Sequence, residues 1–326
     1  MFPANGASVS IPLRGQAYAE ALRGRVRAEL SSVATSKGKS RGGIVRSLWE
    51  FHRRWLHDGP NGRVTHVLIP WIAWEGADVV CIHDLAPSIL GGVYSQVGDH
   101  YVRAAARRAK RIDCASQFTR DLLAKRFGPK IAEKCFVTLI PIPPMPITRL
   151  PPLYDVIWVG DSCPNKGLER LLAALPERRP AAIVVRLRSA RHESVVGDWV
   201  GAARRRGASV TVFTDLSAGD LDTLYRQSRV YVSTSDYEGF HIPPLEHFLR
   251  GGAVLLPELR PYTDSYPASS VCWYSSDATR SQLRAKILEA TDWPTPQPGA
   301  VRAVACRHSY ERAADTLVAN YERVAG

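Results

Sequence analysis

The second half of the chain alternates between short apolar runs and helix-length segments, and this alternation limits the possible folds more than any other feature. The apolar runs have the β-branched content of strands and lie at 155–160, 182–188, 209–213, 229–233 and 253–257. Segments with helical character separate them or follow them, at 166–175, 193–206, 218–227, 243–250, 278–290 and 309–324. Strands that alternate with helices form parallel sheets with crossover helices, so we predict an α/β fold.

The first half shows a similar alternation. We predict strands near 64–69, 78–83, 111–115 and 135–140 and helices near 43–56, 94–109 and 117–127, with 25–33 as a further candidate strand. Between the halves, IPIPPMPITRLPPLYD (140–155) contains six prolines and no periodicity, which indicates a linker. We therefore predict two doubly wound Rossmann-like domains, 1–145 and 146–326, that face across a cleft, with the last helix packing back on the first domain.

The net charge of +12 is unevenly distributed. Residues 1–150 contain 22 Lys and Arg against 11 Asp and Glu, whereas residues 151–326 contain 21 against 20. A basic half favours an anionic partner, such as a membrane surface or an acidic acceptor, ahead of nucleic acid. In YVRAAARRAKR, helical spacing places Arg103, Arg107 and Lys110 or Arg111 on one face, which could form such a surface.

The apolar runs, the N-terminus and the cysteine spacing indicate the cellular compartment of the protein. No apolar run is long enough to span a bilayer, and the N-terminus lacks a charged segment followed by an apolar block. Six cysteines are scattered without metal-ligand spacing. We therefore expect a cytoplasmic protein with buried free thiols, which can bind the inner face of a membrane peripherally.

The stretch YEGFHIPPLEHFLRGG (237–252) carries the strongest functional signal. Pro243 and Pro244 are tolerated in the first turn of a helix, and a Gly pair ends that helix. Glu238 then lies just before the helix and Glu246 inside it. Backbone N–H groups at the start of a helix favour anions, so this stretch predicts a ligand site with two carboxylates.

Several segments together resemble the family 4 retaining glycosyltransferases of GT-B architecture. They are YEGFHIPPLEHFLRGG, DVIWVGDSCPNKGLERLLAAL, and ADVVCIHDLAP with RAAARRAKRIDCASQFTRDLLAKRFG. The last pair resembles the IHDLxP subgroup, whose members often transfer mannose, rhamnose or related hexoses in bacterial polysaccharide assembly. The resemblance covers roughly residues 42 to 325. It implies a donor-binding C-terminal half and an acceptor-side N-terminal half.

The resemblance and the chemistry of a nucleotide sugar agree on roles in the second half. Glu246 suits the two ribose hydroxyls, and Glu238 suits hydroxyls of the hexose. The backbone around Phe240, His241 and Ile242 suits the diphosphate, with Gly160 nearby at a strand end. Lys166, expected to open a helix, would neutralise the departing diphosphate.

In the first half, the resemblance assigns His83 to the donor sugar and Asp84 to the following loop or the acceptor. Gly42 and Gly43 resemble a glycine loop on the acceptor side and permit close approach of a ligand. The catalytic set is then His83, Lys166 and Glu238.

We therefore expect a retaining hexosyltransferase that moves a sugar from a nucleotide-diphosphate donor, GDP-mannose or a similar one, to a glycan or lipid-linked acceptor. No acidic pair suited to a divalent metal lies near the site, so neither metal nor cofactor is expected. Two alternatives remain open. One is a GT-B enzyme that acts on DNA; the other is a noncatalytic nucleotide-sugar or glycan-binding protein, favoured by departures from the family at Asp161, Asn165 and His241.

Overall fold

The computed structural model describes residues 10–26, 64–68, 73, 77–85, 89, 93–187 and 189–325. The chain divides into two compact units, Met1–Pro143 with Arg307–Gly326 and Pro144–Cys306. The predicted glycine loop with Gly42 and Gly43, the predicted helix 43–56 and most of the candidate strand 25–33 lie outside the described residues. The acceptor and donor roles expected of the two halves stay predictions.

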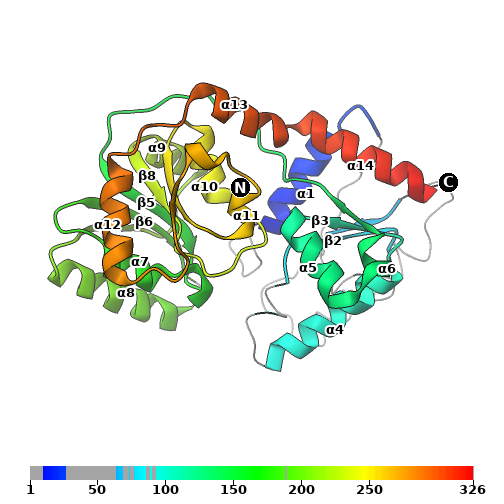
Figure 1. Ribbon diagram of the computed structural model, residues 1–326, viewed down its shortest axis with the longest axis horizontal. Helices are drawn as coiled ribbons and strands as arrows, with labels where there is room; N and C mark the ends of the chain where they lie inside the picture. Colours follow the sequence, from blue (N-terminus) through cyan, green and yellow to red (C-terminus); the bar gives the residue numbers. More distant parts are fainter. Residues whose placement is uncertain are drawn as a thin grey trace. The chain divides into compact units, whose positions relative to one another are not determined.

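The second unit is built on a six-stranded parallel sheet in the order β10-β9-β8-β5-β6-β7 (Figure 1). Its strands are β5 Tyr154–Asp161, β6 Pro180–Arg186, β7 Ser209–Phe213, β8 Ser228–Val232, β9 Ala253–Pro257 and β10 Cys272–Tyr274. Its helices are α7 Leu168–Ala174, α8 Ala190–Arg205, α9 Ala218–Arg226, α10 Ile242–Leu249, α11 Arg260–Thr263, α12 Arg280–Thr291 and α13 Pro298–Arg307. The order from β7 to β10 is that of a doubly wound sheet, as predicted.

Apolar side chains on alternate strand positions divide the helices between the two faces of this sheet. Val156 and Trp158 of β5 belong to a core that includes Leu171 of α7, Val200 of α8 and Ile287 of α12. The buried side chains of α9 and α10 lie against the other face (Figure 1). Both faces are therefore covered, and the ends of the strands are left for loops.

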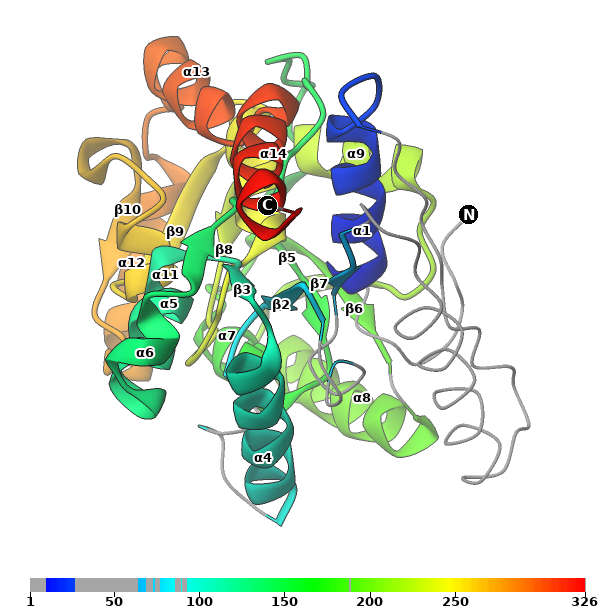
Figure 2. The same ribbon diagram turned by 90° about the vertical axis from the view of Figure 1, so that its right-hand side faces the viewer.

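The first unit contains four described strands, all parallel, in the order β1-β2-β3-β4. They are β1 His66–Val67, β2 Val79–Ile82, β3 Arg111–Cys114 and β4 Cys135–Val137. The described helices are α1 Ser10–Ala21, α4 Val93–Arg108, α5 Gln117–Phe127, α6 Pro129–Ala132 and α14 Tyr310–Ala325. One core joins the sheet to α4, α5 and α6, and a second joins it to α1 and α14. Figure 2 shows α1 and α14 side by side.

Several predicted boundaries are corrected. Lys166 does not open a helix: it ends a 3₁₀ turn, Pro164–Lys166, and α7 begins two residues later. Helix α4 ends at Arg108, so neither Lys110 nor Arg111 lies on the predicted helical face, and Arg111 begins β3. The Arg111 guanidinium donates to Oδ1 of Asn320 at 2.8 Å and 3.2 Å. The elements α1, α6, α11, α13 and β10 were not predicted.

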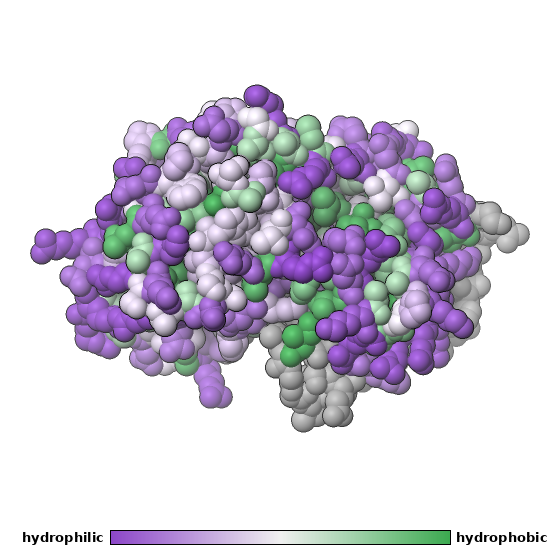
Figure 3. All heavy atoms as spheres, viewed as in Figure 1, coloured by the Kyte–Doolittle hydropathy of each residue, from purple (hydrophilic) through white to green (hydrophobic). Residues whose placement is uncertain are grey.

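The surface and the thiols agree with only part of the sequence interpretation. Hydrophilic side chains predominate on the face seen in Figure 3. Within the described ranges, no helix combines the length and the apolar character needed to cross a membrane. All six cysteines are free, as predicted, and four are buried, but Cys163 is half-buried and Cys306 is exposed.

Candidate functional site

Lys166 and Glu238 form an ion pair in the second unit. The Nζ atom of Lys166 lies 2.6 Å from Oε1 of Glu238, and the two side chains are 21% and 7% exposed. Lys166 comes from the connection between β5 and α7, and Glu238 from the connection between β8 and α10. These strands are neighbours in the sheet, so their carboxyl ends bring together two residues that are 72 positions apart. The fold thus joins two predicted site residues.

The loop that carries Lys166 is held by backbone geometry. Gly167 has φ of 65°, and a Cβ atom there would lie 2.1 Å from the carbonyl oxygen of Thr234. The Thr234 hydroxyl donates to the carbonyl oxygens of Gly167 at 2.9 Å and Lys166 at 3.2 Å. The N–H of Asp236 donates to the carbonyl oxygen of Asn165 at 2.9 Å. Only glycine fits this approach, and the resulting contacts fix the loop against the segment that leads to Glu238.

His241 lies beside the ion pair but is almost completely buried. Its Nδ1 is 2.7 Å from the hydroxyl of Tyr262 and 3.7 Å from Oε1 of Glu238. Burial, followed by the charge of Lys166, lowers the pKa of His241 well below its ordinary value. The imidazole is therefore neutral at pH 7. The Tyr262 hydroxyl also contacts Oγ of Ser233 at 2.8 Å, so His241 belongs to a buried polar chain.

Glu246 lies on α10, where its side chain is half-buried. The hydroxyl of Tyr225, on α9, donates to Oε2 of Glu246 at 3.1 Å. Burial raises the pKa of Glu246, while the charge of Arg250 and the Tyr225 hydrogen bond oppose that shift. Arg250 is fixed in turn, because Nε pairs with Asp222 at 2.7 Å and Nη1 donates to the carbonyl oxygen of Glu246 at 2.7 Å. One carboxylate oxygen of Glu246 is thus oriented by the protein.

The start of α10 has the geometry that the prolines predicted, within one residue. His241 is the N-cap residue, with no side-chain cap, and Ile242 is the first helical residue. Pro243 and Pro244 lack N–H groups, so backbone donors at this end come from Ile242 and the residues before it. Phe240 precedes the cap and is half-buried. A helix N-terminus with this limited set of donors still favours an anion.

Gly160 has a structural explanation. It lies near the end of β5, and a Cβ atom there would lie 2.7 Å from the Trp158 ring. The following residue, Asp161, accepts a hydrogen bond from the N–H of Cys163 at 3.0 Å, which shapes the turn toward Lys166. The glycine therefore makes room for tryptophan, and its expected contact with a donor stays a prediction.

His83 and Asp84 follow β2 and belong to the first unit, whereas Lys166, Glu238 and Glu246 belong to the second. Nε2 of His83 lies 3.1 Å from the carbonyl oxygen of Leu68, an acceptor, so this nitrogen carries the proton. Burial, with a contribution from the charge of Arg14, lowers the pKa of His83 to about 3. The side chain is neutral, and its expected role toward a donor sugar stays a prediction.

Sequence reasoning missed five residues that contact Glu246, His241 or the Lys166 loop, namely Tyr225, Ser233, Thr234, Arg250 and Tyr262. Arg250 follows Glu246 by four residues, and this helical spacing is a signal that could have found it. Tyr225 and Tyr262 lie on other helices, and Ser233 and Thr234, although close to Glu238 in sequence, act through Tyr262 and through the Lys166 loop, so none of the four has such a local signal. Among the described side chains, no group of three or more His, Cys, Asp and Glu is placed to hold a metal ion.

No protein-family model and no curated protein matches this sequence. Solved structures do match the fold. Sucrose-phosphate synthase from Thermosynechococcus elongatus has a TM-score of 0.71 at 16% identity, over 98% of this chain and 94% of that one. The fold is GT-B.

Two further GT-B structures have bound ligands. Anabaena HepE in complex with UDP has a TM-score of 0.65 at 14% identity, over 86% of this chain and 82% of that one. The UDP-forming α,α-trehalose-phosphate synthase from Burkholderia xenovorans, in complex with glucose-6-phosphate, has a TM-score of 0.67 at 11% identity, over 86% and 78%. At these identities the likeness shows the fold, and the family 4 IHDLxP subgroup stays a prediction.

Proposed function

We propose that the protein is a glycosyltransferase that moves a hexose from a nucleotide-diphosphate sugar to a glycan or lipid-linked acceptor. The observation that carries the proposal is the Lys166–Glu238 ion pair, placed just before a helix that bears the oriented carboxylate of Glu246. A nucleotide sugar presents phosphates, ribose hydroxyls and hexose hydroxyls, and this cluster offers a cation and two carboxylates to match them. The GT-B fold agrees with this activity.

In this proposal, the Lys166–Glu238 ion pair has one state without donor and another state with donor bound. Without donor, the ammonium of Lys166 is held by Glu238 at 2.6 Å. A diphosphate carries more negative charge than one carboxylate, so it competes with Glu238 for the ammonium. The ammonium then stabilises the negative charge of the departing diphosphate during transfer. Glu238 can then accept hydrogen bonds from hexose hydroxyls. The lysine therefore acts on the leaving group and Glu238 on the sugar.

Glu246 is proposed to bind the ribose. The Tyr225 hydroxyl occupies Oε2, which fixes the carboxylate plane and directs the remaining acceptor positions. Two adjacent ribose hydroxyls can donate to one carboxylate. Such donors favour the ionised form, which compensates for the effect of burial on the pKa of Glu246.

The donor is proposed to be a nucleotide-diphosphate hexose, and the comparisons favour testing UDP-glucose ahead of GDP-mannose. HepE has been solved with UDP and with UDP-glucose, and the trehalose-phosphate synthase is UDP-forming. Retention of anomeric configuration and independence from metal ions also belong to the proposal. Transfer without a metal ion would require Lys166 and backbone N–H groups to supply the positive charge that stabilises the diphosphate.

A membrane-bound acceptor is a further part of the proposal. The first 150 residues carry nearly all of the net positive charge. A basic surface can bind an anionic membrane that presents a lipid-linked acceptor. Nothing in the described structure favours DNA as the acceptor.

The roles of the two glutamates can be separated by calorimetry. Glu246→Gln should weaken binding of UDP itself by roughly tenfold, the effect of losing about 1.4 kcal/mol at the ribose. Glu238→Gln should leave UDP binding nearly unchanged and depress transfer from UDP-glucose, because its partner is the hexose. Glu258→Gln, an exposed change in the same unit, is the matched control.

The same titrations are repeated with GDP and GDP-mannose to identify the donor base. If the Glu246→Gln and Glu238→Gln proteins bound the same nucleoside diphosphate with equal affinity, the assignment of Glu246 to the ribose and Glu238 to the hexose would be contradicted. Binding without product or donor hydrolysis would favour the noncatalytic alternative.

A further inference from the structure

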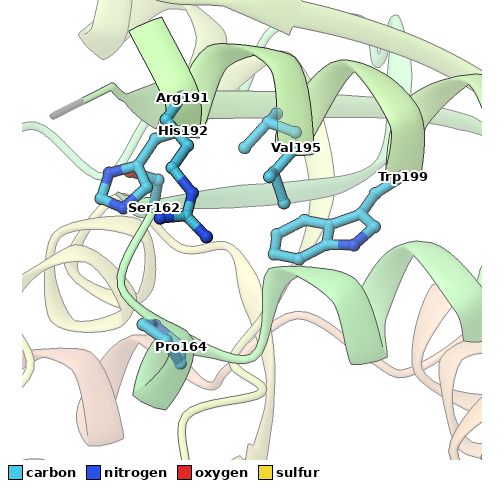
Figure 4. A pocket seen from close by; sticks show the side chains of 7 residues that line it. Ser162, Pro164, Arg191, His192, Val195 and Trp199 are labelled. Carbon is cyan, nitrogen blue, oxygen red and sulfur yellow. The ribbon is translucent and has the colours of Figure 1, made fainter. Parts of the chain in front are cut away.

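A pocket of about 280 Å³ lies in the second unit, and its lining includes none of Lys166, Glu238 and Glu246. Two of its residues, Ser162 and Pro164, come from the connection after β5. The others come from α8 and include Arg191, His192, Val195 and Trp199. The pocket therefore lies on the α8-covered face of the sheet (Figure 4).

One end of the pocket is polar and positively charged. Ser162 is buried, and its Oγ lies 3.1 Å from Nδ1 of His192. The hydroxyl of Ser189 caps α8 by accepting from the N–H of His192, which fixes the start of the helix. Arg191 is exposed, and Figure 4 shows its guanidinium near Ser162 and His192. This end thus combines a fixed imidazole with a cation that solvent-borne ligands can reach.

The other end of the pocket is apolar. Val195 and Trp199 follow Arg191 at intervals of four residues, so the three lie on one face of α8. A rise of 1.5 Å per residue separates Arg191 from Trp199 by about 12 Å. The half-buried indole of Trp199 packs partly against the core, and Pro164 lies across the pocket from the helix. The result is an apolar slot with one basic end.

We propose that this pocket binds a small molecule in which one flat ring carries a single carboxylate or phosphate group. The indole and the proline offer apolar surfaces against which a flat ring stacks. The guanidinium of Arg191 pairs with a carboxylate or phosphate through parallel N–H groups, and His192 adds a second polar contact. The volume is just below the range for ligand pockets, which fits one ring rather than a whole nucleotide sugar.

The test measures binding of four probes to the full chain by calorimetry. Benzoate and phenyl phosphate combine a ring with an anion and should bind, and the stronger of the two identifies the anion. Benzyl alcohol has the ring without the charge, and inorganic phosphate has the charge without the ring. Each of these should bind at least tenfold more weakly than the stronger ring anion. Equal binding of benzyl alcohol or of inorganic phosphate would overturn the proposal.

Two variants locate the probe. Arg191→Glu should weaken binding of the stronger ring anion at least tenfold, and the fold should stay intact because Arg191 is exposed. Arg205→Glu, also exposed on α8 and outside the pocket, should leave the affinity unchanged. Trp199→Ala should also weaken binding tenfold, with its melting temperature recorded because the indole touches the core. Wild-type affinity in the Arg191→Glu protein, or loss of binding in Glu246→Gln, would overturn the proposal.

Discussion

Each unit contains an ion pair with a buried acid, and the two pairs differ in access to solvent. In the first unit, Nη2 of Arg14 lies 3.1 Å from Oδ2 of Asp113, and the side chains are 2% and 0% exposed. Tyr18 donates to the same carboxylate at 2.7 Å, and Arg14 donates to the carbonyl oxygen of Thr138 at 2.7 Å. Arg14 and Tyr18 also contact each other. This pair joins α1 to β3 and the segment after β4.

The Lys166–Glu238 pair of the second unit is shorter, at 2.6 Å, yet Lys166 remains 21% exposed. Its ammonium can therefore exchange the carboxylate for a ligand without opening the core. The comparison shows that distance alone does not distinguish a closed structural pair from one that a ligand can reach. Burial of both partners, with internal hydrogen bonds to each, indicates structure; a buried acid with a reachable cation is suited to binding.

Removal of Arg14 should give the largest effect on stability. Arg14→Met leaves the carboxylate of Asp113 buried without its cation, which should cost about 3–5 kcal/mol of unfolding free energy. Arg23→Met is the control, because Arg23 pairs with Glu20 on the surface and the side chains are 77% and 43% exposed. Its cost should be within about 1 kcal/mol. Denaturant unfolding of both proteins checks this, and similar losses in the two would remove the distinction between buried and exposed pairs.

Removal of Lys166 should affect transfer far more than folding. Lys166→Ala should reduce turnover about a hundredfold or more, the scale for loss of one charge-stabilising donor. Lys286→Ala, an exposed lysine paired with Glu289, is the control and should retain full turnover. Added chelator should leave the wild-type rate unchanged. Loss of activity with chelator and recovery with magnesium or manganese would contradict the proposed role of Lys166 as the source of positive charge.

The regular elements of the second unit could be predicted because their signals are local. The strand 209–213 was placed at its observed bounds, and the helix 243–250 was one residue from α10. By contrast, β10 has only three residues, too few for a period to be recognised. Helix α1 is held by Arg14, whose acidic partner lies 99 positions later. No local pattern reveals such a partner.

The candidate site shows the same limit. The prolines and glycines of 237–252 predicted a helix with Glu238 just before it and Glu246 inside it. The structure has this arrangement. The ion pair between Lys166 and Glu238 depends on the adjacency of β5 and β8, which comes from the order of strands in the sheet. The hydroxyl of Tyr225 reaches Glu246 through the packing of two helices. These contacts are properties of the fold and have no signature in sequence.

Burial of His66, beside the Arg14–Asp113 pair of the first unit, should also make stability depend on pH. Nε2 of His66 lies 3.7 Å from Oδ2 of Asp113, and Nδ1 lies 2.8 Å from the Tyr321 hydroxyl. Burial lowers the pKa of His66 to about 4, despite the opposing charge of Asp113. The unfolded chain binds this proton near pH 6.5, so the stability is present above pH 6.5 and is lost as pH falls toward 4.

The contribution of His66 between pH 7 and pH 5 should be about 2 kcal/mol, since each pKa unit corresponds to about 1.4 kcal/mol. His66→Gln should reduce the slope of stability against pH over that range by up to one proton. His100→Gln is the control, because His100 is exposed on α4. Unfolding measured at four pH values checks this, and an unchanged slope in His66→Gln would show that this imidazole does not control the acid sensitivity of the first unit.

The smallest effect should come from a change of surface charge on α4, which alters neither the Arg14–Asp113 pair nor the Lys166–Glu238 pair. Arg107 is exposed, whereas Arg103 stacks over the Phe127 ring at 5.3 Å and Lys110 pairs with Asp78 at 3.0 Å. If this surface binds an anionic membrane, Arg107→Glu should weaken binding to acidic vesicles by about 1 kcal/mol or somewhat more, since a positive charge is lost and a negative one gained. Arg280→Glu in the second unit makes the same change of charge and should have no effect on binding to vesicles.

Co-sedimentation at low and physiological salt checks this prediction, because exposed charges are screened over about 8 Å at physiological ionic strength. Failure of the wild-type protein to bind acidic vesicles at low salt would remove the membrane from the proposed function and leave the proposed transfer activity unaffected, because the proposed donor contacts belong to the other unit.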